Sequence, residues 1–162
     1  MDQLIRKLQA DYPAYRFIVG EGLCWSPANG QILYRLDDSE AAISGVLHEL
    51  AHAVLGHQDY CSDIDLLQKE VAAWQQAITL ASLYKQSIDP NHAQDCLDTY
   101  RDWLHKRSTC PICQICGVQQ KSTQYTCINC GQAWRVSSSR FCRAYRLRQT
   151  KRAKADASAR LQ

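Results

Sequence analysis

The segment HELAHAVLGH, from His48 to His57, concentrates residues that could do chemistry. It holds three of the chain's five histidines and one glutamate. On an α-helix, residues i and i+4 lie on one face, so His48 and His52 can present two imidazoles to one metal ion. Glu49 lies beside them, where its carboxylate can act as general base on a water molecule. The HExxH pattern therefore predicts a catalytic zinc site.

The alternative interpretation of this segment is an amphipathic surface helix whose histidines are solvated. Small or apolar residues surround the motif on several sides, among them Leu47, Leu50 and Ala51. A solvated histidine pair would not need such neighbours. The pattern and its surroundings together favour the metal site.

Catalytic zinc needs a third protein ligand and an open fourth position. His57 lies about 140° around an ideal helix from His52, which makes it a poor third ligand. Glu70, in LLQKEVAAW, places a charge on the apolar stretch of the following helix, where a charge usually has a partner. We therefore expect Glu70 to be the third ligand. A solvated Glu70 is the alternative, and weaker candidates are Cys61, Asp63 and Asp65.

A second group of metal-binding residue types follows. Five of the nine cysteines lie between Cys110 and Cys130, and CQICG and CINCG form two CxxCG knuckles. Four thiolates at this spacing predict a closed, structural zinc site that stabilises a region too small to fold unaided. Cys110 and Cys113 form an alternative first pair, but the glycine after Cys116 matches the second knuckle. The preferred ligands are Cys113, Cys116, Cys127 and Cys130.

The net charge of +3 conceals a segregation along the chain. Residues 140–162 hold eight basic residues and one acidic residue, whereas residues 1–139 hold 11 basic and 15 acidic residues. Basic residues interleaved with aromatic ones attract phosphate backbones, although a solubilising end is the alternative. The candidate nucleic-acid contacts are Arg140, Arg143, Arg146, Arg148, Lys151 and Arg152.

Local patterns predict the elements that must position these residues. Strand-forming residues flank the turn SPANG, so we expect a β-hairpin over about 15–36. Three helices are expected after it: the HExxH helix, capped by Asp37, Asp38 or Ser39 and ended by Gly56, a second over DIDLLQKEVAAWQQAITLASLYKQ, and a third that starts at Asp89-Pro90. The expected domains are 1–107, a cysteine module over 108–136 and a basic tail over 137–162.

Several classes of protein are disfavoured. No run of 18 apolar residues exists, so a membrane span is not expected. The N-terminal sequence lacks the apolar core of a signal peptide. The odd number of cysteines, together with the CxxC pairs, favours metal binding in a reducing cytoplasm over a disulfide framework.

HELAHAVLGH, followed at this distance by KEVAAWQQAITLA, resembles the ImmA/IrrE family of gluzincin-type zinc metallopeptidases over roughly residues 10–85. The resemblance implies an α+β, mainly helical zincin-like domain with a small β-hairpin or sheet. It also implies His48 and His52 as ligands, Glu49 as base and Glu70 as third ligand. The sequence departs from the family at Val71, in lacking a Leu-Met-Pro-like helix end, and in its zinc-ribbon-like cysteine module. SprT-like proteases also join HExxH to a zinc ribbon, but their third ligand is a histidine, and none lies between His57 and His92.

Together these features predict an intracellular zinc endopeptidase that cleaves a protein partner. A transcriptional repressor or another DNA-associated protein is the candidate substrate, recruited by the ribbon and the basic tail. The expected cofactors are one catalytic and one structural Zn²⁺, and the candidate oxyanion donors are His57, Tyr60 and His92. The alternative is a non-catalytic adaptor that binds nucleic acid or protein, although such a scaffold would not need the base Glu49.

Overall fold

The computed structural model describes residues 1–138, 140 and 145–149. It is an α+β structure whose described residues form four helices and two small sheets. The chain divides into two units, Met1–Asp102 and Trp103–Gln162. None of the described helices is long and apolar enough to cross a membrane.

The sheet of the first unit has three strands, β1 (Arg16–Val19), β2 (Cys24–Ser26) and β3 (Gln31–Tyr34). β3 lies in the centre, antiparallel to β2 and parallel to β1. The expected single hairpin over 15–36 is therefore only partly correct. The hairpin consists of β2 and β3, joined through the turn SPANG. Residues 20–22 lie outside any strand, and β1 pairs with β3 on the side opposite to β2. This topology leaves β2 at an edge of the sheet.

The three expected helices begin and end close to where the sequence predicts. They are α2 (Glu40–Val54), α3 (Asp63–Leu83) and α4 (Pro90–Ser108), and a further helix, α1 (Asp2–Asp11), precedes the sheet. Ser39 is the cap of α2, and its hydroxyl accepts a hydrogen bond from the backbone amide of Ala42 at 3.2 Å. Gly56, with a φ of 65°, follows the end of α2 in the left-handed conformation that glycine readily adopts.

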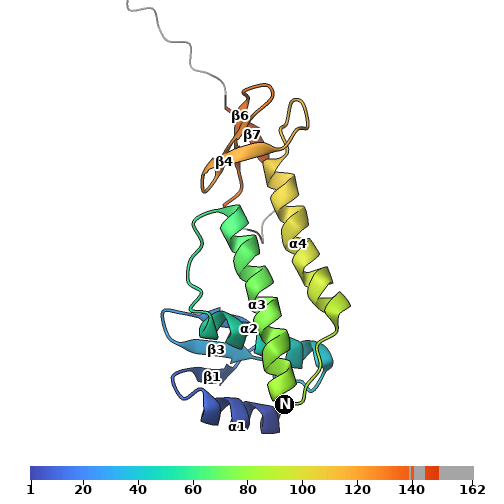
Figure 1. Cartoon of the computed structure of the whole chain (residues 1–162). Coiled ribbons are helices and arrows are strands. Elements are labelled where there is room, and N and C mark those ends of the chain that lie inside the picture. Colours follow the sequence, from blue (N-terminus) through green and yellow to red (C-terminus); the bar gives the residue numbers. More distant parts are fainter. Residues whose placement is uncertain (139, 141–144, 150–162) are drawn as a thin grey trace, which may run out of the picture. The chain divides into compact units, whose positions relative to one another are not determined.

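α2 lies between the small sheet and α3 in the first unit (Figure 1). Its Val46, Leu47 and Leu50 are completely buried. The buried face of α3 is made largely of small residues, which let the two helices approach closely, whereas Ile78 and Leu83 are exposed although their spacing suggests an apolar stripe. Those small residues are Ala73, Ala77 and Ala81. Their face also carries Glu70.

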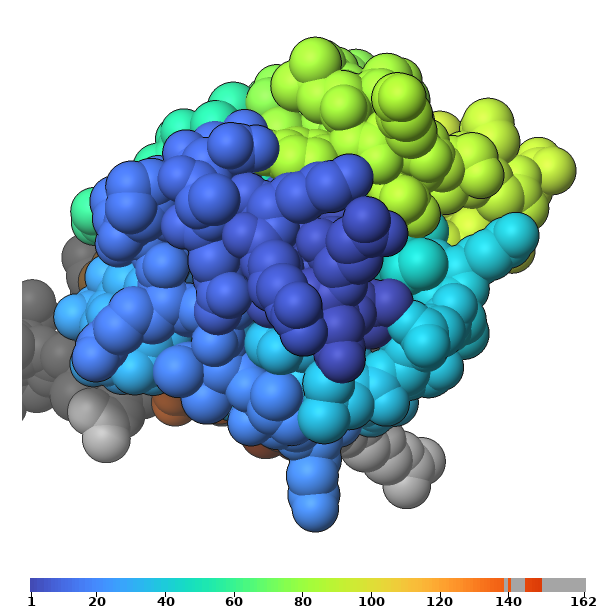
Figure 2. Space-filling model, turned by 90° about the horizontal axis from the view of Figure 1, so that it is seen from below, coloured from blue at the N-terminus to red at the C-terminus, as the bar shows by residue number. Residues whose placement is uncertain are grey.

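α1 covers the lower face of the first unit, beside the last turns of α3 (Figure 2). Its apolar face contributes Leu4, Ile5 and Leu8 to the core. The hydroxyl of Tyr84, at the end of α3, donates a hydrogen bond to the carboxylate of Asp11 at 2.6 Å. α1 thus contributes to the same hydrophobic core as α2 and α3.

The second unit is a four-stranded antiparallel sheet in the order β4-β5-β6-β7. The strands are β4 (Gly117–Lys121), β5 (Gln124–Cys127), β6 (Ala133–Val136) and β7 (Arg146–Arg148). Its buried core is small and consists of Cys110, Tyr125, Cys127, Trp134 and Val136. A core of this size contributes little stability, so the thiols beside it matter for folding.

The last turns of α4 belong to the second unit, which places the boundary five residues before the expected one. The guanidinium of Arg107 is buried and donates hydrogen bonds to the carbonyls of Ser122 and Ser137. The indole of Trp134 donates to the carbonyl of Arg107 at 2.9 Å. The aromatic ring of Trp103 lies 4.4 Å from the Arg107 guanidinium. These buried contacts attach the helix end to the sheet.

Candidate metal centres and the cleft beside them

Three predicted side chains of the first unit converge on one point. The Nε2 atoms of His48 and His52 are 3.1 Å apart. Oε2 of Glu70 lies 3.2 Å from the first nitrogen and 3.7 Å from the second. Two turns of α2 supply the imidazoles, and α3 supplies the carboxylate. The structure thus brings together the three residues that the sequence predicts as ligands of one metal ion.

The spacing and type of these three atoms fit a zinc ion. Zinc binds histidine nitrogen and carboxylate oxygen at about 2.0–2.2 Å in a tetrahedron, so its ligand atoms lie about 3.3 Å from one another. The three observed separations bracket that value. The set contains three donors, and it lies beside a cleft, so a fourth position is available to water or substrate.

The carboxylate of Glu70 is held in its charged form. Burial on its own raises the pKa of Glu70, but interactions with His48 and His52 outweigh burial and lower that pKa to about 2. A carboxylate that is ionised at neutral pH is the form that binds a metal cation.

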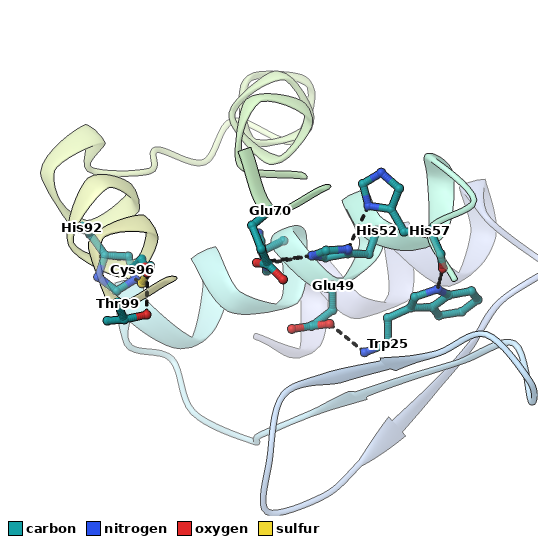
Figure 3. Close-up of polar contacts among 9 residues, drawn as sticks. Trp25, Glu49, His52, His57, Glu70, His92, Cys96 and Thr99 are labelled. Carbon is teal, nitrogen blue, oxygen red and sulfur yellow. Dashed lines mark hydrogen bonds and ion pairs between the residues drawn. The ribbon is translucent and has the colours of Figure 1, made fainter. Parts of the chain in front are cut away.

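Further contacts orient the two imidazole rings. The ring of His48 stacks on Trp74 of α3, with 4.3 Å between ring centroids and an interplanar angle of 28°. The ring of His52 meets His57, with 2.9 Å between the two Nδ1 atoms (Figure 3). Burial and the neighbouring His52 lower the pKa of His57. The contact of Trp74 with His48 is not predicted from the sequence.

Glu49 lies on the same helix, where the edge strand β2 reaches it. The backbone amide of Trp25 donates a hydrogen bond to Oε2 of Glu49 at 2.6 Å (Figure 3). The indole of Trp25 also donates to the carbonyl of His57 at 2.9 Å. Burial and the charge of Glu49 raise the pKa of the Cys24 thiol beside them. Strand β2 is therefore attached to the candidate site at two points, which the sequence did not indicate.

A cleft of about 300 Å³ opens beside these residues and is lined by His48, Glu49, His52 and Glu70. Its other walls are mostly apolar or aromatic. They include Leu23, Trp25, Tyr60, Leu66 and Tyr100, with Asp59 and Lys69 among the polar residues. A volume of this size accommodates a few side chains of a peptide.

The weaker candidate residues take other places. Asp65 accepts hydrogen bonds from the backbone amide of Cys61 at 2.8 Å and contacts the ammonium of Lys69 at 3.3 Å. Asp63 is buried in the first turn of α3, outside the three-residue cluster. His92 lies edge-on to Trp74, and its Nε2 is 3.9 Å from the thiol of Cys96. Of the three candidate oxyanion donors, Tyr60 and His57 line the cleft and His92 does not.

In the second unit, the thiols that converge are those of Cys110, Cys113, Cys127 and Cys130. The sulfur separations are 3.4 Å between Cys113 and Cys127, and 3.6 Å from Cys130 to Cys110 and to Cys113. Four thiolates around zinc at about 2.3 Å lie about 3.8 Å apart, whereas a disulfide would join two sulfurs at about 2.0 Å. The donor set therefore fits a four-coordinate metal ion.

This grouping corrects the preferred choice of Cys116 as a ligand, because Cys110 takes its place. The two knuckles that supply the converging thiols are CPICQ (110–114) and CINCG (127–131). In the first, the Cys110 amide bonds the carbonyl of Ile115, and in the second the Cys127 amide bonds the carbonyl of Gln132. The residues after each second cysteine, Gln114 and Gly131, have φ angles of 61° and 69°.

The glycine that suggested the other pairing has a different function. A Cβ on Gly117 would lie 2.5 Å from the ring of Trp134 and 2.6 Å from the carbonyl oxygen of Thr126. Gly117 is thus required for close packing in β4. Cys116 is exposed, with its sulfur 4.0 Å from Nδ1 of His105. The signal that could have identified the true knuckle is Pro111, which is suited to the first corner of a tight turn.

A backbone amide favours the thiolate form of Cys113 in this cluster. A hydrogen bond from the backbone amide of Ile115, assisted by the Asn129 side chain, lowers the pKa of Cys113 to about 6. A thiol that ionises below neutral pH is ready to bind a metal cation. In Cys130, by contrast, a backbone hydrogen bond from Gln132 favours the thiolate, but burial and the neighbouring cysteines outweigh it and raise the pKa.

Among the arginines and lysines expected to contact nucleic acid, Arg146 and Arg148 bond carbonyl groups of the second unit. The guanidinium of Arg146 donates to the carbonyl of Thr109 at 2.9 Å, and that of Arg148 lies 3.5 Å from the carbonyl of Pro111. Both therefore attach β7 to the first knuckle. Arg140 is half-buried. The remaining three, Arg143, Lys151 and Arg152, lie outside the described residues.

Comparison of the chain with protein-family models, with curated proteins and with solved structures finds no match.

Proposed function

We propose that this chain is a zinc-dependent endopeptidase that cleaves a protein partner. The observation that carries the proposal is the convergence of His48, His52 and Glu70 beside a carboxylate that is not part of the cluster, Glu49. A site that only bound metal would need the three ligands but no base. The cleft and the edge strand beside them supply room and backbone groups for a peptide.

His48, His52 and Glu70 would hold the zinc ion. When bound, such an ion polarises a carbonyl group and acidifies a water molecule. Glu49 is the proton carrier, because its carboxylate accepts a proton from the attacking water and returns it to the leaving amine. The amide of Trp25 donates to one oxygen of Glu49 and orients the carboxylate. Tyr60, on the wall of the cleft, is the candidate donor to the oxyanion.

An extended peptide is the substrate form that this cleft suits best. β2 pairs with β3 on one side only, so an added strand can lie along its other side, where the Trp25 amide already donates to Glu49. The walls made by Leu23, Trp25 and Leu66 favour apolar side chains near the scissile bond. We retain a transcriptional repressor or another DNA-associated protein as the proposed class of partner, on sequence grounds alone.

The four-cysteine cluster would hold a second zinc ion with a structural role. All four donors are thiols, so a tetrahedral ion there has no open position for chemistry. We propose that the second unit is a zinc ribbon that recruits the protein substrate. Nucleic-acid recruitment through β7 is less favoured, since Arg146 and Arg148 bond carbonyls of their own unit.

The test is peptide cleavage by the zinc-loaded chain and by Glu49→Gln. Both are incubated with a library of cellular proteins, and new N-termini are identified by mass spectrometry. We expect cleavages that fall by about 10²–10⁴-fold in Glu49→Gln, because the general base is removed. Zinc content should not change, because Glu49 is not a ligand.

The matched control is Glu40→Gln, at the exposed start of the same helix. It should cleave like the unsubstituted chain. Equal cleavage by Glu49→Gln and the unsubstituted chain would contradict the proposal, as would the absence of any new N-terminus from either. If the unsubstituted chain cleaves nothing, and both it and Glu49→Gln bind the same protein partner, the chain is an adaptor.

A further inference from the structure

His57 has no part in the three-residue cluster, yet it makes two close contacts around it. Its Nδ1 lies 2.9 Å from Nδ1 of His52, the ring nitrogen on the side away from Glu70 (Figure 3). Its backbone carbonyl accepts the indole N–H of Trp25. One residue thus contacts both a candidate ligand and the edge strand of the cleft.

The backbone holds the His57 ring in this place. On an uninterrupted helix, His57 would point about 140° away from His52. Gly56 instead has a φ of 65°, which ends the helix and turns the chain back. The amide of His57 then donates to the carbonyl of His52 at 2.9 Å. The backbone carbonyl of His57 accepts a hydrogen bond from the indole of Trp25. Both backbone groups of His57 are therefore held in place.

Proton counting decides the direction of the bond between the two imidazoles. Nε2 of His52 faces His48 and Glu70, so metal binding there requires that this nitrogen carry no proton. A neutral imidazole has one ring proton, which must then lie on Nδ1 of His52. Nδ1 of His57 is consequently the acceptor, and the proton of the His57 ring lies on its Nε2.

We propose that His57 is a positioning residue, which accepts the Nδ1 proton of His52 and so fixes the ring and tautomer in which His52 binds zinc. Carboxylates and backbone carbonyls commonly hold metal-binding histidines in this way. Here a third histidine, five residues further along the chain, does so. The proposal rests on the proposed zinc site, but not on peptide cleavage.

The first experiment uses nuclear magnetic resonance of the ¹⁵N-labelled, zinc-loaded full chain. We expect a protonated Nδ1 on His52 and an unprotonated Nδ1 on His57, with a scalar coupling between these two nitrogens across the hydrogen bond. A proton on Nδ1 of His57 would overturn the proposal. This measurement reports on the hydrogen bond and its direction, independently of peptide cleavage.

The second experiment compares zinc affinity, by competition with a chelator, between two substitutions. His57→Phe keeps a ring but removes the acceptor, and it should weaken the histidine site by about 10–100-fold. His57→Gln keeps an acceptor oxygen and should recover most of that affinity. His105→Phe, on the exposed end of α4, is the matched control and should bind zinc normally. Normal affinity in His57→Phe would contradict the proposal.

These outcomes are separable from those that test peptide cleavage. If zinc binds as expected and His57 accepts the proton, but no peptide is cleaved, the proposed enzyme activity fails and the positioning role stands. If cleavage depends on Glu49 while His57→Phe binds zinc normally, the positioning role alone fails.

Discussion

The two candidate metal centres of this chain differ in how completely protein surrounds them. The cysteine cluster has four like donors from two short knuckles and leaves no position open. The histidine centre has three donors from two long helices and faces a cleft. The knuckles lie beside a core of a few residues, whereas the helices contribute to a larger core of their own. We therefore expect a metal ion in the cysteine cluster to stabilise the second unit, and the packed helices of the first unit to hold the histidine centre in position.

The largest expected effect is on the closed centre. Cys127→Ser removes one of its four thiolates, and structural zinc contributes about 10–16 kcal/mol to the folding of small zinc domains. We expect loss of one zinc ion and rapid amide hydrogen exchange throughout residues 117–136, with α2 and α3 still protected. Hydrogen exchange followed by nuclear magnetic resonance, together with elemental analysis, measures both effects.

Cys116→Ser is the matched control, because its thiol lies outside the cluster. It should retain the zinc ion and the protected amides. Equal losses in the Cys116 and Cys127 variants would return Cys116 to the ligand set and contradict the observed pairing.

The next effect concerns the open centre. His48→Ala/His52→Ala should lower the zinc content from two ions per chain to one, since each of the two residue groups can hold one ion. Helical content should change little, because Val46, Leu47 and Leu50 keep α2 buried. Elemental analysis and circular dichroism test this. If both proteins hold a single ion even after zinc is added, the histidine centre does not bind zinc and the peptidase proposal fails with it.

Much of the histidine centre follows from local signals in the sequence. Helical spacing places His48 and His52 on one face, and Ser39 and Gly56 delimit the helix at the observed ends. Glu70 was predicted because it is a charge on a helix face that must be buried, and it is buried. Each of these inferences needs only one helix, or two adjacent ones. The α+β class follows from the same local patterns.

The features that sequence reasoning missed depend on distant segments. The amide of Trp25 reaches Glu49 only because β2 lies at the sheet edge, and that follows from the parallel pairing of β1 with β3. Parallel pairing leaves no local turn signal. Trp74 stacks on His48 across two helices, which neither helix predicts alone.

A smaller effect concerns Glu70 in the protein stripped of metal. Its pKa is about 2 in the folded state, below its ordinary value of 4.5, so folding favours the ionised form. The resulting stability is complete above pH 4.5 and is lost as the pH falls through about 2. It amounts to on the order of 3 kcal/mol at neutral pH. Urea unfolding between pH 2 and 7 should show this loss, and Glu70→Gln should lack that part of it. Parallel curves for the two proteins would contradict the expected coupling with His48 and His52.

The last prediction concerns why Gly117 misled the choice of ligands. Gly117 and Gly131 each follow a cysteine, but they are glycines for different reasons. Gly117 admits Trp134 and the Thr126 carbonyl, whereas Gly131 has open space around it and a φ of 69°. Gly117→Ala should therefore destabilise the zinc-loaded second unit by about 1–3 kcal/mol through overpacking. Gly131→Ala should cost about 1 kcal/mol, through the left-handed backbone alone.

Thermal unfolding of the zinc-loaded chain, followed by the fluorescence of its tryptophans, ranks these two variants. The near-ultraviolet spectrum should change only in Gly117→Ala, because that substitution displaces the indole of Trp134. If Gly131→Ala were the more damaging change and Gly117→Ala left Trp134 undisturbed, Gly117 would be a turn glycine after all. That result would favour Cys113 and Cys116 as the first pair of metal ligands. If Gly117→Ala is the more damaging change, Gly117 is required for a packing contact and Gly131 for its backbone torsion angle. A CxxCG pattern in the sequence does not distinguish these two requirements.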